Sequence, residues 1–236
     1  MRAEYSENRS CPQRNSAEHE KNVGAQSADG QEMVKQDGAD LLERILSRDN
    51  LNRAYKQVRA NKGAPGIDGM TIEDALPWLR EHRDELLESI RQGKYKPQPV
   101  RRKEIPKPDG GVRKLGIPTV IDRIIQQAIA QQLVPIYEPL FSEESYGYRP
   151  GRSGQQAIRK VKWYAEQGYT SAVLVDLSKY FDTLNHELLM NLLRRNIHDK
   201  RVIELIKRYL KAGVMENGLR VKTTEGSPQG GPLSPM

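Results

Sequence analysis

The sequence contains very little cysteine, since Cys11 is the only one among 236 residues. A single thiol excludes both a disulfide framework and a zinc site built from cysteines. Long apolar runs are also missing: no stretch approaches the roughly 18 residues that a membrane span requires. The N-terminus is polar and has no apolar signal-peptide core. We therefore expect a cytoplasmic protein that does not contact a membrane.

Positive charge predominates in the chain, but it is unevenly distributed. The whole sequence carries a net charge of +7, whereas residues 1–40 hold five Lys/Arg against eight Asp/Glu, a balance of −3. Residues 41–236 therefore carry +10. A basic surface attracts polyanions through counterion release, although many basic proteins bind no nucleic acid. Charge alone is a weak indication of RNA binding.

The N-terminal part of the chain divides into two regions of different composition. Residues 1–38 are rich in Ser, Gln, Asn, Glu and Gly, with hardly an apolar residue before Met33. Such a segment buries too little surface to offset its ordering entropy, so we expect it to be disordered. Apolar residues then recur at helical spacing across residues 39–93. Thr71 and Asp74 form a potential capping box in this helical region, which Gly93 ends.

The most basic window of the sequence, residues 94–118, contains a predicted hairpin. Residues 109–111, Asp-Gly-Gly, separate two short runs and favour a tight turn, so that the two arms would carry Lys107 and Arg113. The charge of this segment alone does not favour either of two interpretations. The segment is either a solvated edge hairpin, whose lysines discourage edge pairing, or a phosphate-binding hairpin.

Several further helices can be predicted from apolar spacing and capping residues. One spans residues 121–136, and we place its glutamines, at positions 126, 127, 131 and 132, on its outer face. Ser153, Asn185 and Asp199 are the potential N-caps of three more helices. The loop at 145–153 combines tyrosines with arginines, which either grip RNA through stacking and phosphate contacts or simply pack.

An apolar run that ends in a carboxylate is the most informative stretch. Four apolar residues, 172–175, immediately precede Asp176, which predicts a strand buried on both faces. Asp176 must then be paired, hydrogen-bonded or bound to a metal. Further along, a short predicted strand over 219–224 leads into the loop 226–235, Gly-Ser-Pro-Gln-Gly-Gly-Pro-Leu-Ser-Pro. Backbone N–H groups of such a loop can face an anion. His186 and His198 receive no chemical role.

These segments, in this order, resemble the reverse transcriptases encoded by bacterial group II introns. The matching motifs are 61–69 (Asn-Lys-Gly-Ala-Pro-Gly-Ile-Asp-Gly, from the N-terminal extension), 105–118 (first block), 145–153 (second block), 175–182 (motif A) and 226–235 (motif B). The similarity covers nearly everything from Leu41 to Met236. It implies an α+β, right-hand polymerase with a disordered tail at 1–38, an N-terminal helical extension at 39–93, fingers at 94–168 and a partial palm at 169–236.

The resemblance also implies which residues carry the chemistry. Asp176 falls on the aspartate that binds two catalytic Mg²⁺ ions, and Leu177 on the residue whose backbone carbonyl also touches metal. The residues that it implies for dNTP binding are Lys107, Arg113, Phe181, Gln229 and Gly230. Phe181 falls on the steric gate that excludes a ribose 2′-OH. The basic residues that we expect to contact RNA are Arg101, Arg102, Lys103, Arg149 and Arg152.

The implied activity is RNA-directed DNA synthesis on an intron RNA template with a DNA primer and dNTPs, together with maturase assistance to splicing. One departure is important: the family's motif C, Tyr-Ala-Asp-Asp, with its metal-binding carboxylates, does not occur in the sequence. We therefore expect a fragment or truncated reading frame that polymerises little. The alternatives are a non-catalytic RNA-binding or maturase-like protein and a retron or CRISPR-associated reverse transcriptase. The N-terminal extension and motif B argue against the last.

Overall fold

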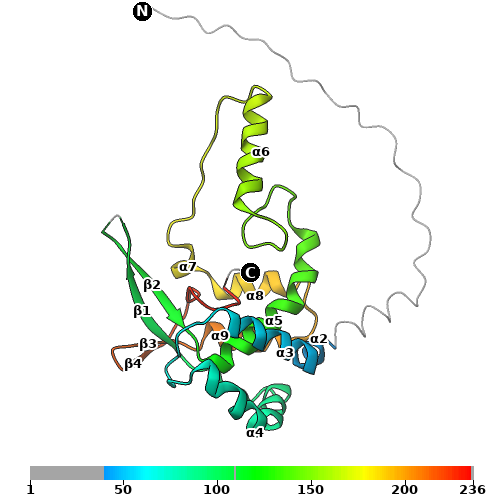
Figure 1. Ribbon diagram of the computed structural model, residues 1–236, viewed down its shortest axis with the longest axis vertical. Helices are drawn as coiled ribbons and strands as arrows, with labels where there is room; N and C mark the ends of the chain where they lie inside the picture. Colours follow the sequence, from blue (N-terminus) through cyan, green and yellow to red (C-terminus); the bar gives the residue numbers. More distant parts are fainter. Residues whose placement is uncertain (1–39, 109, 235–236) are drawn as a thin grey trace, which may run out of the picture.

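The computed structural model describes residues 40–108 and 110–234 (Figure 1). The tail predicted at 1–38 lies outside the described residues. Within the described parts of the chain, no helix combines the length and the apolar character that crossing a membrane requires.

Helix α5 (Val120–Tyr137) is the centre of the helical core. The helices that contact it from the N-terminal side are α2 (Leu41–Leu46), α3 (Arg48–Ala60) and α4 (Ile72–Arg91). Because α5 is covered on several sides, the outer-face prediction for its glutamines is wrong. Gln126 is buried, while Gln131 and Gln132 each donate a 2.9 Å hydrogen bond to the buried Asn50 side chain.

The capping residues mark the helix starts as predicted. Thr71 and Ser153 form complete capping boxes with Asp74 and Gln156 at the starts of α4 and of α6 (Gly154–Glu166). The Asn185 side chain caps α8 (His186–Leu193), and that of Asp199 caps α9 (Lys200–Leu210). The remaining helical elements are η1 (Glu138–Leu140) and α7 (Tyr180–Thr183). These helix starts depend on neighbours in the chain, which is why the sequence indicates them.

Among the described residues, four short strands form one sheet in the order β2-β1-β3-β4. The predicted hairpin is confirmed: β1 (Val100–Pro106) pairs antiparallel with β2 (Val112–Ile117), and Ile105 lies opposite Arg113. β1 also runs parallel to β3 (Val214–Glu216), which pairs antiparallel with β4 (Leu219–Val221). The strand predicted at 219–224 is therefore present but shorter.

The strand predicted at 172–175 does not form. Residues 171–177 have no regular secondary structure, and Val173, Leu174 and Val175 are 90%, 98% and 84% exposed. The segment is a long connection from the far end of α6 back to α7 (Figure 1). None of the described strands pairs with it, and a strand is stable only when neighbours satisfy its backbone groups and cover its faces. The prediction of a doubly buried strand is therefore wrong for this structure.

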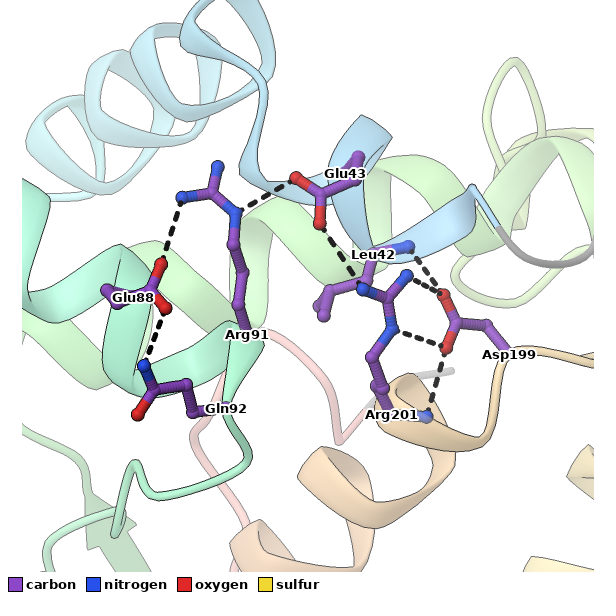
Figure 2. Close-up of polar contacts among 7 residues, drawn as sticks. All are labelled: Leu42, Glu43, Glu88, Arg91, Gln92, Asp199 and Arg201. Carbon is purple, nitrogen blue, oxygen red and sulfur yellow. Dashed lines mark hydrogen bonds and ion pairs between the residues drawn. The ribbon is translucent and has the colours of Figure 1, made fainter.

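A polar network joins the N-terminal helices to α9 (Figure 2). The Glu43 carboxylate accepts from Arg91 Nε at 3.0 Å and from Arg201 Nη1 at 3.3 Å. Asp199 Oδ2 accepts from the Leu42 backbone N–H and from Arg201 Nη2, both at 3.0 Å. These contacts link segments that are distant in sequence, so α2, α4 and α9 form one body.

Candidate active site

The glycine-rich loop after β4 is hydrogen-bonded to the turn around α7. Ser227 N donates to Phe181 O at 2.7 Å, and Gly226 N donates to Leu184 O at 2.8 Å. Gly226 has a φ of +79°, and a Cβ there would lie 2.8 Å from Asp182 O and 2.9 Å from Phe181 O. Because only glycine adopts this conformation freely and leaves room for these carbonyls, Gly226 permits the close contact.

His186 holds the same loop from the start of α8. Its side chain is buried, and its Nε2 donates to Gly226 O at 2.6 Å. The carbonyl oxygen can only accept, so Nε2 carries the hydrogen in this contact. Sequence reasoning gave His186 no role, because nothing in the local pattern indicates a partner 40 residues away.

The glycine-rich loop also reaches the hairpin. Gly116 N in β2 donates to Gln229 O at 2.7 Å, and Leu115 forms a parallel bridge with Gln229. Gly230 has a φ of +118°, and a Cβ at this position would lie 3.0 Å from Gly116 O. Gly230 therefore allows a close backbone approach, and in this structure the neighbour is β2.

These contacts border an open cavity of about 750 Å³ between the hairpin, the segment 175–182 and the glycine-rich loop. Six of the residues implied by the resemblance line it, namely Lys107, Arg113, Asp176, Leu177, Phe181 and Gln229. They come from three segments that lie far apart in the sequence. Gly230 is not among the lining residues.

The cavity combines clustered cations with two carboxylates. Its cations are Lys107, Arg113, Lys114 and Lys179, and its carboxylates are Asp176 and Asp182. Lys114 lies 4.0 Å from Glu216, whereas the other three cations form no ion pair within the described part of the chain. Unpaired cations in one concave site attract a polyanion, and a nearby carboxylate suits a hard metal ion.

Residues 105–236 match the protein family described as reverse transcriptase (RNA-dependent DNA polymerase). The chain belongs to this reverse transcriptase family. Its α+β fold is that of the family's fingers and palm, as expected from the sequence. Similarity to a solved partial Cas6-RT-Cas1–Cas2 complex, with a TM-score of 0.55 and 24% identity, covers 83% of this chain and 32% of that one, and supports the fold alone. The domain boundaries stay a prediction.

Curated relatives of this reverse transcriptase chain include intron-encoded proteins. Protein YkfC of Escherichia coli is 41% identical over 202 residues, covering 83% of this chain and 53% of that protein. The group II intron-encoded protein LtrA of Lactococcus lactis is 36% identical over 218 residues, covering 89% of this chain and 35% of that protein. The chain thus spans about half or less of the length of these relatives. The similarity to LtrA agrees with the group II intron resemblance.

Reverse transcriptases generally use divalent metal ions, so the oxygen donors of the cavity are informative. No group of three or more metal-ligating side chains occurs among the described residues. The Asp176 carboxylate and the Leu177 carbonyl nevertheless belong to residues of one cavity. Mg²⁺ is usually bound through one or two carboxylates, with waters and substrate phosphates completing its shell. The oxygen donors of the cavity therefore fit a divalent ion that takes its remaining ligands from water or from a bound substrate.

Two of the arginines expected to contact RNA are engaged by the reverse transcriptase chain itself. Arg101 donates to Pro65 O from Nε at 3.1 Å and from Nη2 at 2.8 Å. The Arg149 side chain is only 7% exposed, and it donates to the Glu138 carboxylate at 2.8 Å and to Ser145 O at 2.9 Å. Each guanidinium thus holds a loop in place. The expectation that these two residues contact RNA stays a prediction.

The other three basic residues differ in their exposure. Lys103 is exposed on β1, and Arg152 is half-buried with its guanidinium 5.8 Å from the centre of the Tyr146 ring. Arg102 is also half-buried, and its Nε has no hydrogen-bond partner within the described residues. These three also remain residues of the reverse transcriptase that we expect to contact RNA.

Sequence reasoning missed a buried acid at the base of the hairpin. The Asp122 carboxylate accepts from Tyr95 Oη at 2.7 Å, from Gln98 N at 3.1 Å and from Thr119 Oγ1 at 2.8 Å. Burial raises the pKa of Asp122, against the opposing effect of these hydrogen bonds. Gln98 precedes β1 and Thr119 follows β2, so Asp122 fixes both ends of the hairpin. In the sequence, Thr119 stands three residues before Asp122, and this spacing at a helix start could have indicated the contact between them.

Proposed function

We propose that this chain forms the nucleotide-binding part of an RNA-directed DNA polymerase of the group II intron type. The observation that supports the proposal is the cavity itself, which brings together Lys107, Arg113 and Asp176 from separate parts of the sequence. In the proposal, Lys107 and Arg113 bind the triphosphate of a dNTP. Asp176, with the Leu177 carbonyl, holds Mg²⁺.

The proposed reaction is in-line displacement, in which the primer 3′ oxygen attacks the α-phosphorus and pyrophosphate leaves. When bound, two Mg²⁺ ions would activate the attacking oxygen and neutralise charge on the leaving group. Lys107 and Arg113 would orient the triphosphate through charge-assisted hydrogen bonds. Phe181, half-buried at the cavity wall, would exclude a ribose 2′-OH by steric contact. Gln229 would lie beside the incoming nucleotide.

The proposed template is intron RNA, with a DNA primer, and the proposed contacts are Arg102, Lys103 and Arg152. Support comes from the similarity to LtrA, whose name describes a group II intron-encoded protein. DNA synthesis and assistance to splicing are proposed for the whole protein, because this chain spans 35% of the length of that relative.

A second candidate function is non-catalytic RNA binding. It is favoured by the carboxylate content of the cavity, where only Asp176 and Asp182 are available within the described residues. Asp176 is the only carboxylate that the resemblance assigns to the metal, and one carboxylate holds two divalent ions poorly. This candidate predicts salt-sensitive RNA binding without any Mg²⁺-dependent nucleotide binding.

Titration of the 236-residue chain with dTTP, with and without Mg²⁺, tests the polymerase proposal. We expect Mg²⁺ to strengthen dTTP binding, and we expect Asp176→Asn to remove that increase. Arg113→Ala should weaken dTTP binding whether or not Mg²⁺ is present. Asp84→Asn, which changes a carboxylate that is 92% exposed on α4, is the matched control for lost charge. Equal gains from Mg²⁺ in the original chain and in Asp176→Asn would show that the metal assignment is wrong.

A further inference from the structure

Lys179 adopts a backbone conformation that glycine would adopt more easily. It is the N-cap of α7, with φ +51° and ψ +32°, in the left-handed region. A side chain with a Cβ makes this region unfavourable, by roughly 1–2 kcal/mol per residue. Four described non-glycine residues have positive φ, and Lys179 is the one among them that lines the cavity. Strain of this kind is concentrated at functional sites.

The backbone at Lys179 is held firmly in this conformation. Its carbonyl oxygen accepts from Asp182 N at 2.8 Å, from Thr183 N at 3.1 Å and from Thr183 Oγ1 at 3.1 Å. Phe181 lies two residues further on and is itself bound to Ser227. The starting point of the lysine side chain is therefore fixed relative to Phe181.

The Lys179 ammonium has no acidic partner within the described residues. Lys114, in the same cavity, lies 4.0 Å from Glu216, but no carboxylate pairs with Lys179. Lys107 and Arg113 add further positive charge to this cavity from the hairpin. Like charges gathered in one concave site repel each other until a polyanion binds. The arrangement therefore favours a ligand with several negative charges.

We propose that Lys179 is a third triphosphate-binding cation, which acts from the α7 side of the cavity while Lys107 and Arg113 act from the hairpin. This inference rests on the proposed nucleotide site and extends it. In this proposal a ligand with several phosphates contacts cations from both segments, whereas the single phosphate of a nucleoside monophosphate offers fewer charges to share between them. Lys179 accordingly selects nucleoside triphosphates over shorter nucleotides. The ligand requirement explains why lysine occupies a position at which glycine would be less strained.

Two substitutions at Lys179 separate its charge from its backbone conformation. Lys179→Gly removes both the ammonium and the strain, and Lys179→Asn removes the ammonium while keeping a residue type that tolerates the left-handed region. The matched control is Lys162→Gln, which removes a lysine with a side chain 77% exposed on α6. The probes are dTTP, dTMP and inorganic tripolyphosphate, each with Mg²⁺, titrated into the 236-residue chain.

We expect both Lys179 variants to bind dTTP and tripolyphosphate about tenfold more weakly, the effect of losing one charge-assisted contact. Binding of dTMP should be unchanged, and Lys162→Gln should bind all three probes like the original chain. Lys179→Gly should melt at the same temperature as the original chain or higher. A glycine variant that melts at or above the original temperature is folded, so its weaker binding of dTTP would come from the lost ammonium and not from misfolding.

Unchanged dTTP binding in both Lys179 variants would overturn the inference. If Asp176→Asn and Arg113→Ala still weaken binding in that case, the proposed function stands without it. A lower melting temperature for Lys179→Gly, with normal binding by Lys179→Asn, would give Lys179 a purely structural role. Failure of the original chain to bind either dTTP or tripolyphosphate would overturn both the inference and the nucleotide site.

Discussion

Replacing His186 with leucine should loosen the glycine-rich loop while leaving the helical core folded. The substitution removes the 2.6 Å hydrogen bond from Nε2 to Gly226 O and leaves a buried carbonyl without that donor. Leaving a buried polar group unpaired costs about 1–3 kcal/mol. His186 Nδ1 is itself buried without a partner among the described residues, so its removal offsets part of this cost. We therefore expect a net effect of about 1–2 kcal/mol, near the lower end of that range.

Native-state hydrogen exchange measures this effect at individual amides of the glycine-rich loop. The amide of Ser227 is protected by its bond to Phe181 O, and that of Gly226 by its bond to Leu184 O. A local loss of about 1–2 kcal/mol should speed exchange at both amides by roughly five- to thirtyfold. Amides within α5 should exchange at their original rates.

His186→Gln is the matched control, because its amide can still donate a hydrogen bond from a similar distance along the side chain. It should restore most of the protection that leucine removes. Equal exchange of the Ser227 amide in the original chain and in His186→Leu would refute the reasoning, as would a loss of protection spread evenly over α5.

Three further predictions concern backbone strain, a buried acid and the basic loop. Gly226→Ala should lower the free energy of unfolding in urea by more than about 1 kcal/mol, whereas Gly110→Ala, at φ +81° with open space around it, should show the cost of positive φ alone. Burial raises the pKa of Asp122 in the folded protein, so the contribution of this group to stability is present at low pH and is lost as pH rises through the raised pKa. Asp122→Asn should therefore make the free energy of unfolding in urea less dependent on pH across this range. Arg149→Ala should lower stability by about 2–3 kcal/mol, through loss of its charged hydrogen bonds, and Arg152→Ala should instead weaken RNA binding with little change in melting temperature.

Features that depend on neighbours in the chain could be predicted from the sequence. The capping boxes at Thr71 and Ser153 are confirmed, since each involves residues three positions apart. The hairpin that carries Lys107 and Arg113 is confirmed for a similar reason, because a short turn sets its register.

Predictions that depend on contacts between distant parts of the chain were wrong or were not made. The strand at 172–175 needs neighbouring strands that local composition does not reveal. The burial of Gln126 follows from the packing of other helices around α5. The site residues were identified through family resemblance, not physical reasoning, and their roles remain proposals. Lys179 and His186 received no role from the sequence, because their importance comes from backbone conformation and from a contact made across the fold.

The exposed segment at 172–175 has a practical consequence for the behaviour of this protein in solution. Ala-Val-Leu-Val is uncharged, free of proline and rich in residues that favour strands, and its apolar side chains point into solvent. Such a segment can pair with a second copy of itself, so we expect self-association to increase with protein concentration. Asp176 at its end limits this tendency by charge repulsion. The titrations proposed above therefore belong at low micromolar protein, with light scattering monitored throughout.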